Sequence, residues 1–371
     1  MSNRFVQRIS RRTVLGTGLF LGTSWALKAC NTASVPGGTT PAESPTAGAG
    51  GQIVTGSFPG TTEALFREYA SLFNQSGKGQ LSIVPLLAFE QVARLKAAPD
   101  NPPFDVVILD DGQTDIAFKE GLLQPLPADK ITNLSNVDPL FINDKGLAPT
   151  FYMQGVVIGY NPERIKTPPS SWQALLDPNL DGQIGLVSMN SILGTSFMVE
   201  LGKLQGGSES DIEPAFAALK QMLPKLGGVA ANPGALSTLF QQGEVDIAPI
   251  WHNDALALKA KGVPIEWAVP ETGMTGARYS LNVVSKPKSG LDSAAAFVDM
   301  ALSKEAQTML ASSPYYYVPS DKTVSLAAAI TEKIGAKNAT EFMKQVNILD
   351  WQTINQQRAA WIERFNKEVS A

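Results

Sequence analysis

The sequence contains one cysteine and one histidine among its 371 residues, Cys30 and His252. One cysteine excludes an intrachain disulfide framework and a cysteine-based zinc site, and one histidine excludes a histidine-rich metal site. Any Ser-His-Asp triad would have to use His252. No segment after the first thirty residues is long and apolar enough to cross a bilayer. Basic residues are not in excess, with 30 Lys and Arg against 34 Asp and Glu, so nothing indicates a nucleic-acid partner.

The rest of the composition is that of a globular protein. Hydrophobic residues make up 44% of the chain and charged residues 17%, which is too apolar for a disordered chain, and the sequence shows neither repeats nor heptads. At roughly 150 residues per domain, the length indicates two domains, each able to bury a core.

The first 29 residues predict an export signal peptide. They combine a basic start with a short apolar stretch at residues 14–27 and contain no acidic residue. This pattern is typical of a secretion signal and not of a structural helix. Residues 10–15 (SRRTVL) resemble the twin-arginine export motif. The alternative is an ordinary secretion signal with an incidental pair of arginines.

Cys30 is predicted to carry a lipid, because residues 27–30 (LKAC) resemble a bacterial lipobox. Residues 30–51 then run through Thr, Pro, Gly, Ala and Ser with little charge, which predicts a flexible linker. Without the five basic residues of the leader, 25 basic residues remain against 34 acidic ones, a net charge of −9. We therefore expect an acidic, exported lipoprotein at the periplasmic face of the inner membrane, or at the outer face of the cell membrane of a Gram-positive organism.

The body of the chain alternates predicted strands and helices in two blocks. In the first block, strands are expected at residues 52–57, 81–87 and 104–109, and each is followed by a helix, at 61–73, 89–97 and 114–120. Thr61 or Thr62 is the expected N-cap of the first helix. This rhythm predicts an open, mostly parallel sheet, in which ligands lie beyond the C-terminal ends of the strands. The segments that follow Ser57 and Asp110 thus become candidates for a binding site.

The second block repeats this alternation. Strands are expected at 155–160, 182–187, 245–250 and 280–284, and helices at 171–176, 196–204, 212–223, 236–241 and 293–302. Residues 341–369 contain amphipathic helical stretches. Trp251 directly follows an apolar strand, which favours a place in a cleft over a place in the core. His252 is expected to be a hydrogen-bonding wall residue, and Asp254 to cap the next helix or to contact a ligand.

An ordered set of motifs resembles the extracellular solute-binding proteins of ABC importers, in the branch named for spermidine and putrescine binding. The motifs are residues 104–112 (FDVVILDDG), 121–126 (GLLQPL), 155–161 (GVVIGYN), 168–172 (PPSSW), 176–178 (LDP), 243–248 (GEVDIA), 302–307 (LSKEAQ) and 317–320 (YVPS). They cover most of the chain after residue 52 in the order of the family.

The resemblance implies a type 2 periplasmic-binding-protein fold, an α/β architecture with two lobes that close on a ligand by hinge bending. Lobe 1 would comprise residues 52–152 plus 277–371, with C-terminal helices packed on one or both lobes, and lobe 2 would comprise 153–276. It further implies a monomer without a cofactor that binds a small solute, performs no reaction and presents its closed form to the transmembrane subunits of a permease. The ligand-binding residues expected from strand ends and from the resemblance are Ser57, Phe58, Asp110, Asp111, Thr195, Trp251, Asn253, Asp254, Arg278 and Tyr279.

The chemistry of the ligand stays open at this point. Polyamine binders of this family hold ammonium groups with carboxylates, but the matching positions here carry Ile192, Thr195, Ala277 and Tyr279. An Arg fork suits a carboxylate or a phosphate, so an amine-plus-carboxylate solute would bind its amine to Asp110 or Asp111 and its carboxylate to Arg278. The alternative is that Arg278 is an ordinary surface residue.

Other functions remain as alternatives. Ferric iron is one, since some relatives bind it through tyrosines, but residues 315–317 (YYY) are better explained by aromatic packing. A sensor or an exported enzyme on this fold is another. The sequence shows no phosphate loop, nucleophile elbow or paired metal ligands. Asp110 and Asp111 are expected to point in different directions at a strand end, which disfavours joint acid–base catalysis.

Overall fold

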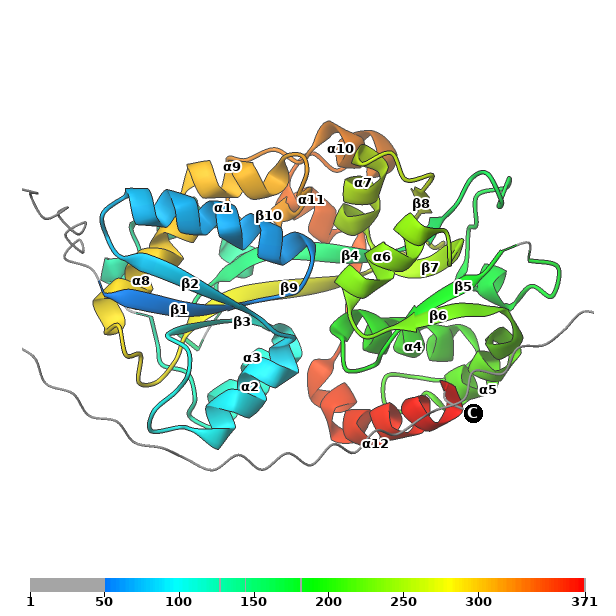
Figure 1. Cartoon of the computed structure of the whole chain (residues 1–371), viewed down its shortest axis with the longest axis horizontal. Helices are drawn as coiled ribbons and strands as arrows, with labels where there is room; N and C mark the ends of the chain where they lie inside the picture. Colours follow the sequence, from blue (N-terminus) through cyan, green and yellow to red (C-terminus); the bar gives the residue numbers. More distant parts are fainter. Residues whose placement is uncertain (1–50, 127, 144, 181, 370–371) are drawn as a thin grey trace, which may run out of the picture. The chain divides into compact units, whose positions relative to one another are not determined.

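The computed structural model describes residues 51–126, 128–143, 145–180 and 182–369 (Figure 1). The predicted signal peptide, Cys30 and nearly all of the predicted linker lie outside the described residues. Within the described part of the chain, no helix has both the length and the apolar character that a membrane span requires.

The first lobe is built from three strands and the helix that follows each of them. β1 pairs in parallel with both of its neighbours, and every residue of β3 is buried. The elements are β1 (Gln52–Ser57), α1 (Thr61–Gln75), β2 (Gln80–Pro85), α2 (Ala88–Ala97), β3 (Val106–Asp110) and α3 (Asp111–Lys119). The expected strand–helix alternation is therefore confirmed for this lobe.

The second lobe repeats this design. β5 pairs in parallel with β6 and β7, and β7 is buried along its whole length. The elements are β5 (Ile184–Val187), α4 (Ile192–Leu204), α5 (Glu213–Met222), β6 (Leu226–Ala230), α6 (Pro233–Gln242), β7 (Ile247–Trp251) and α7 (His252–Ala260).

Two long antiparallel strands connect the lobes, β4 (Thr150–Tyr160) and β9 (Met274–Val283). They give one sheet of order β2-β1-β3-β9-β4-β7-β5-β6. In Figure 1, β4 and β9 run from the half that holds β1–β3 to the half that holds β5–β7. The sheet is thus parallel among β1–β3 and among β5–β7, and antiparallel where β9 and β4 join these strands and each other. β9 begins six residues earlier than the sequence predicted.

The remaining elements cover this sheet. β8 (Glu266–Ala268) and β10 (Val318–Pro319) pair with β4, and β11 (Val346–Ile348) pairs with β9. The other helices are α8 (Leu291–Ala301), α9 (Lys304–Ala311), α10 (Ala328–Ile334), α11 (Ala339–Met343) and α12 (Trp351–Val369), with short 3-10 helices at Ala128–Lys130, Thr132–Asn136, Pro139–Phe141, Trp172–Leu176 and Leu223–Lys225. One contiguous cluster of buried apolar side chains extends through both lobes, and a smaller one lies between α2 and β3.

The C-terminal helix α12 contacts both lobes. Asn355 donates a hydrogen bond to the carbonyl oxygen of Gly112 in α3, at 3.2 Å. Further along the helix, Arg364 forms an ion pair with Glu213 of α5. Figure 1 shows α12 beneath α4 and α5, with its first turns toward α3. α12 therefore places its own side chains where the two lobes meet.

Candidate functional site

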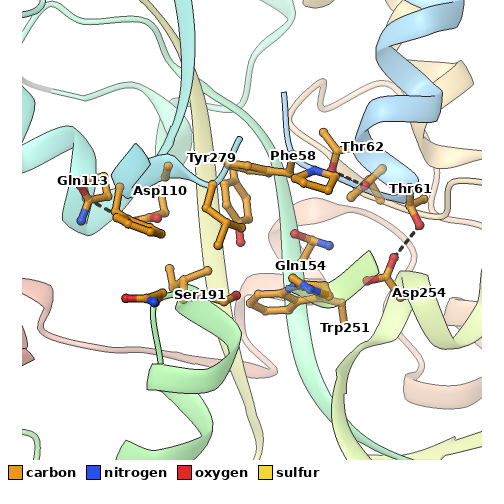
Figure 2. Close-up of a pocket in the computed structure, with 18 of the residues that line it drawn as sticks. Phe58, Thr61, Thr62, Asp110, Gln113, Gln154, Ser191, Trp251, Asp254 and Tyr279 are labelled. Atoms are coloured by element: carbon orange, nitrogen blue, oxygen red, sulfur yellow. Dashed lines mark hydrogen bonds between the residues drawn. The ribbon is translucent and has the colours of Figure 1, made fainter. Parts of the chain in front are cut away.

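A cavity lies where the C-terminal ends of β1, β3 and β7 face one another (Figure 2). The first lobe contributes Phe58 and Asp110, and the second contributes Trp251 and Asp254. Its accessible volume is about 40 Å³. This is room for a few waters, whereas pockets for organic ligands measure about 300–1,000 Å³. Residues of both lobes thus line a space much smaller than such pockets.

Six helices begin at this cavity, because each strand of a parallel βαβ unit leads into a helix at its C-terminal end. Residues at or next to the N-termini of α1, α2, α3, α4, α6 and α7 line it: Thr61, Ala88, Asp110, Ser191, Pro233 and Asp254. A helix N-terminus carries a partial positive charge and free N–H groups. The backbone therefore makes the lining electropositive before any side chain is considered.

One end of the cavity is formed by Asp254. Its Oδ1 accepts a hydrogen bond of 2.6 Å from the hydroxyl of Thr61 in the first lobe, and a longer one from the amide of Asn253. Burial raises the pKa of Asp254 from 3.8 to about 6, against the lowering effects of the Thr61 hydrogen bond and of the Lys261 charge. Asp254 does not cap α7, which corrects that expectation.

The opposite end holds Asp110 and Arg358. Oδ1 of Asp110 accepts the backbone N–H of Gln113 and caps α3. Burial raises the pKa of Asp110, while the charge of Arg358 acts to lower it. Arg358 comes from α12 and is 6% exposed. In Figure 2, Asp110 and Ser191 lie on one side of the cavity, and Asp254 and Thr61 lie on the other.

Aromatic rings form the wall between these ends. Phe58 meets Tyr279 edge-on at 5.2 Å, and Trp251 meets the same ring at 6.5 Å and 83°. Figure 2 shows the three side chains around the middle of the cavity. The hydroxyls of Tyr317 and Thr62, which also line the cavity, are hydrogen-bonded at 2.8 Å. Such rings pack on methylene groups and attract cations through their faces.

The structure brings five of the ten predicted residues to the cavity: Phe58, Asp110, Trp251, Asp254 and Tyr279. Three others lie behind the lining. Ser57 is the buried last residue of β1. Asn253 accepts a hydrogen bond of 2.7 Å from Gln154. The hydroxyl of Thr195 donates a hydrogen bond to the carbonyl oxygen of Met189 and accepts one from the Nε–H of Arg358.

Asp111 and Arg278 lie in a separate hollow and pair with each other, at 3.0 Å between Oδ2 and Nε. The separation of Asp111 from Asp110 follows from the strand end, where successive side chains point to opposite sides. The structure therefore places Arg278 beside Asp111 and outside the cavity that Asp110 lines, and its contact with the carboxylate of a ligand stays a prediction.

Sequence reasoning missed Arg358. A signal was present, since Trp351, Ile354, Arg358 and Phe365 recur at helical spacing and form the buried side of α12. An arginine in an otherwise apolar stripe indicates a charge that the fold buries. The cavity also takes in Gln113, which follows β3, Ser191 and Ile192, which follow β5, and Gln154 from the interior of β4.

His252 hydrogen-bonds as expected but lies behind the cavity lining. Its Nδ1 accepts the backbone N–H of Gly155 at 3.0 Å, and Nε2 lies 3.2 Å from the carbonyl oxygen of Tyr316. Burial lowers the pKa of His252 to about 4, so the ring is neutral at pH 7. Within the described residues, no group of three or more His, Cys, Asp and Glu side chains is placed to hold a metal ion.

Comparison with known proteins agrees with this architecture. The sequence profile of a family described as "Bacterial extracellular solute-binding protein" matches residues 100–357. The spermidine/putrescine-binding periplasmic protein of Escherichia coli K12 is 28% identical over 191 residues, covering 49% of this chain and 53% of the relative. The chain thus spans about half the length of this curated relative.

Two further proteins are informative. The "Putative 2-aminoethylphosphonate-binding periplasmic protein" of Salmonella typhi is 25% identical over 258 residues, or 66% of this chain and 72% of the relative. The solved periplasmic binding protein AfuA of Actinobacillus pleuropneumoniae, with exogenous fructose-6-phosphate bound, superposes with a TM-score of 0.70 at 21% identity, over 86% of this chain and 99% of that one. The latter match shows a two-lobe periplasmic-binding-protein fold.

Proposed function

Because the chain belongs to the family of bacterial extracellular solute-binding proteins, we propose that it is the substrate-binding component of an ABC importer. It captures a small organic solute, polyamine-like or amino-acid-like, and delivers it without chemical change to the transmembrane subunits of a permease. The names of the relatives support this class of solute, since they mention spermidine, putrescine and 2-aminoethylphosphonate.

The observation that carries the proposal is the hydrogen bond from Thr61 of the first lobe to Asp254 of the second, across a cavity lined by both lobes. With about 40 Å³ of free space, the cavity is smaller than pockets for organic ligands, so we expect the lobes to separate before a solute enters. β4 and β9 are the connections about which this opening would occur. A closed form that contacts the ligand from both sides is favoured when the ligand binds.

The proposed lobe boundaries cut these two strands. Lobe 1 comprises residues 52–152 plus 277–371, and lobe 2 comprises 153–276, so the cuts fall within Thr150–Tyr160 and Met274–Val283. α12 belongs to lobe 1 by sequence but also contacts α5 of lobe 2. Export through the predicted signal peptide and a lipid on Cys30 complete the proposal and would place the protein at the membrane that holds the permease.

Closure of the lobes can be tested by substituting Gly234 of α6, which lies against Gly60 of the first lobe. A Cβ atom there would lie 3.2 Å from Cα of Gly60 in the other lobe, which is a tight contact, so a bulky side chain at this position is expected to oppose closure of the lobes. Gly234→Leu is expected to weaken solute binding at least tenfold. In small-angle X-ray scattering, it should also keep the radius of gyration from shrinking on ligand addition. Gln242→Leu, at the exposed end of the same helix, is the matched control and should behave as wild type.

The solute is found by a thermal-shift screen of polyamines, amino acids, aminoalkylphosphonates, small carboxylates and sugars. A ligand at one hundred times its Kd adds about 2.7 kcal/mol to the free energy of unfolding, which is a visible shift. Binding without a change in radius of gyration, or equal binding by Gly234→Leu, would contradict capture by closure.

A further inference from the structure

Arg358 is a buried cation without an anionic partner among the described residues. Its Nε donates to the hydroxyl of Thr195 at 3.1 Å, and its Nη2 donates to the carbonyl oxygens of Asn190 and Met189 at 3.0 and 3.3 Å. All three acceptors are neutral. Within the described part of the chain, no carboxylate lies within 4.0 Å of the guanidinium, and Nη1 has no hydrogen-bond partner. Burial of such a charge is costly unless a counter-charge reaches it.

The guanidinium is held at the start of α4. Asn190 directly precedes Ser191, the N-cap of this thirteen-residue helix, and both residues line the cavity together with Ile192 and Arg358. The hydrogen bonds through Nε and Nη2 and the ring of Trp351, 5.4 Å from the guanidinium carbon, fix the orientation of the side chain. A helix N-terminus and an Arg fork are each suited to an oxyanion, and here they occur side by side at one end of the cavity.

Asp110 lies at the same end, but its carboxylate already caps the N-terminus of α3. It accepts the N–H of Gln113, and its effect on Arg358 is a longer-range attraction without a direct ion pair. The other end offers the opposite charge. Asp254 is 5% exposed and faces the cavity beside Thr61, and Trp251 and Tyr279 lie between the two ends.

From this arrangement we propose that the solute is a zwitterion, with a carboxylate, phosphonate or phosphate group on Arg358 and the α4 N-terminus, and an ammonium group on Asp254. The spacer between the two groups lies against Trp251. This inference rests on the proposed capture of a solute in the cavity and specifies the chemical class of that solute. A diamine is disfavoured, because one of its ammonium groups would meet the guanidinium.

Calorimetric titration of the purified protein tests the proposal with four probes. 2-Aminoethylphosphonate and 4-aminobutanoate carry both charges, ethylphosphonate carries the anion alone, and putrescine carries two cations. At least one zwitterion is expected to bind more tightly than ethylphosphonate and putrescine, and comparison of the first two probes separates a phosphonate site from a carboxylate site.

Variants of Arg358 identify the anion site. Arg358→Gln is expected to weaken zwitterion binding at least tenfold, and Arg358→Lys, which keeps the charge but loses the fork, to weaken it less. Arg364→Gln, on the same helix but paired at the surface with Glu213, is the matched control and should stay within twofold of wild type. The Lys variant and the wild-type preference for zwitterions keep the test valid if Arg358→Gln does not fold.

A double variant separates contact with the ligand from neutralisation of Asp110. If Arg358 only balances Asp110, the Asp110→Asn/Arg358→Gln protein regains binding, and the proposal is overturned. If Arg358 contacts the ligand, the double variant stays weak. Putrescine binding more tightly than both zwitterions, or unchanged zwitterion binding by Arg358→Gln, would also overturn the anion site but leave solute capture intact. Silence from all four probes would count against both.

Discussion

The two ends of the cavity each bury a charge, but they support it differently. Asp254 accepts a hydrogen bond from Thr61 of the opposite lobe, so its environment depends on closure. Arg358 of α12 donates instead to Thr195 of α4 and to a backbone carbonyl oxygen just before α4, so this end depends on the contact between the C-terminal helix and the second lobe. The comparison indicates that the Asp254 end is completed where α1 meets α7, and the Arg358 end where α12 meets α4.

The pH dependence of stability should show the largest effect, since burial brings the pKa of Asp254 close to neutrality. Its folded pKa of about 6 exceeds the ordinary 3.8, so between these values the folded protein holds a proton that the unfolded chain has released. The stabilisation is complete below pH 3.8 and is lost as the pH rises through 6. The full loss is about 3 kcal/mol, at roughly 1.4 kcal/mol per pKa unit.

Denaturant unfolding of the ligand-free wild type and of Asp254→Asn, from pH 4 to pH 8, measures this effect. The difference in unfolding free energy between the two proteins should shift by about 3 kcal/mol against the wild type as the pH rises. His252 acts in the opposite sense, since its folded pKa of about 4 makes stability fall as the pH drops below 6.5. Because both proteins contain His252, the subtraction removes its contribution. A constant difference would show that Asp254 titrates normally.

The cross-lobe hydrogen bond should have the next largest effect. Thr61→Val removes the donor to Asp254 and leaves the carboxylate with the weaker Asn253 contact. Hydrogen bonds to charged groups contribute about 1.5–3 kcal/mol, so we expect solute affinity to fall about tenfold by calorimetry. Thr61→Ser keeps the hydroxyl and should bind within about threefold of wild type. Equal affinity of the Val and Ser variants would mean that the bond does not contribute to closure.

The smallest effect on affinity and stability is expected from Arg278 and Asp111, which lie in the separate hollow. Arg278 and Asp111 pair with side chains 31% and 27% exposed, and such pairs contribute about 0–1 kcal/mol. Arg278→Gln and Asp111→Asn should therefore leave solute affinity within twofold and the free energy of unfolding within about 1 kcal/mol of wild type. A tenfold loss of affinity in Arg278→Gln would return this residue to the list of ligand contacts.

Asp110 and Asp111 illustrate how much of the site can be predicted. Their position after a buried strand was enough to place them at the edge of the sheet where ligands bind. Which of the two faces the cavity depends on how β3 pairs with β9 and on where α3 begins, and both are long-range properties of the sheet. The same reasoning placed Trp251, the last residue of β7, and Phe58, which follows β1, at the cavity, whereas the side chain of Asn253 turns toward Gln154.

By itself, the sequence determined the alternation of strands and helices, the two-lobe fold and the strand ends at which Phe58, Asp110 and Trp251 meet. These properties depend on local periodicity and on the order of motifs along the chain. Only the tertiary structure decided that Arg358, 163 residues from its partner Thr195, joins the cavity and that Arg278 does not. The reason is physical: the side of α12 that is buried, and the side chains that it meets, are set by packing between segments that no local pattern connects.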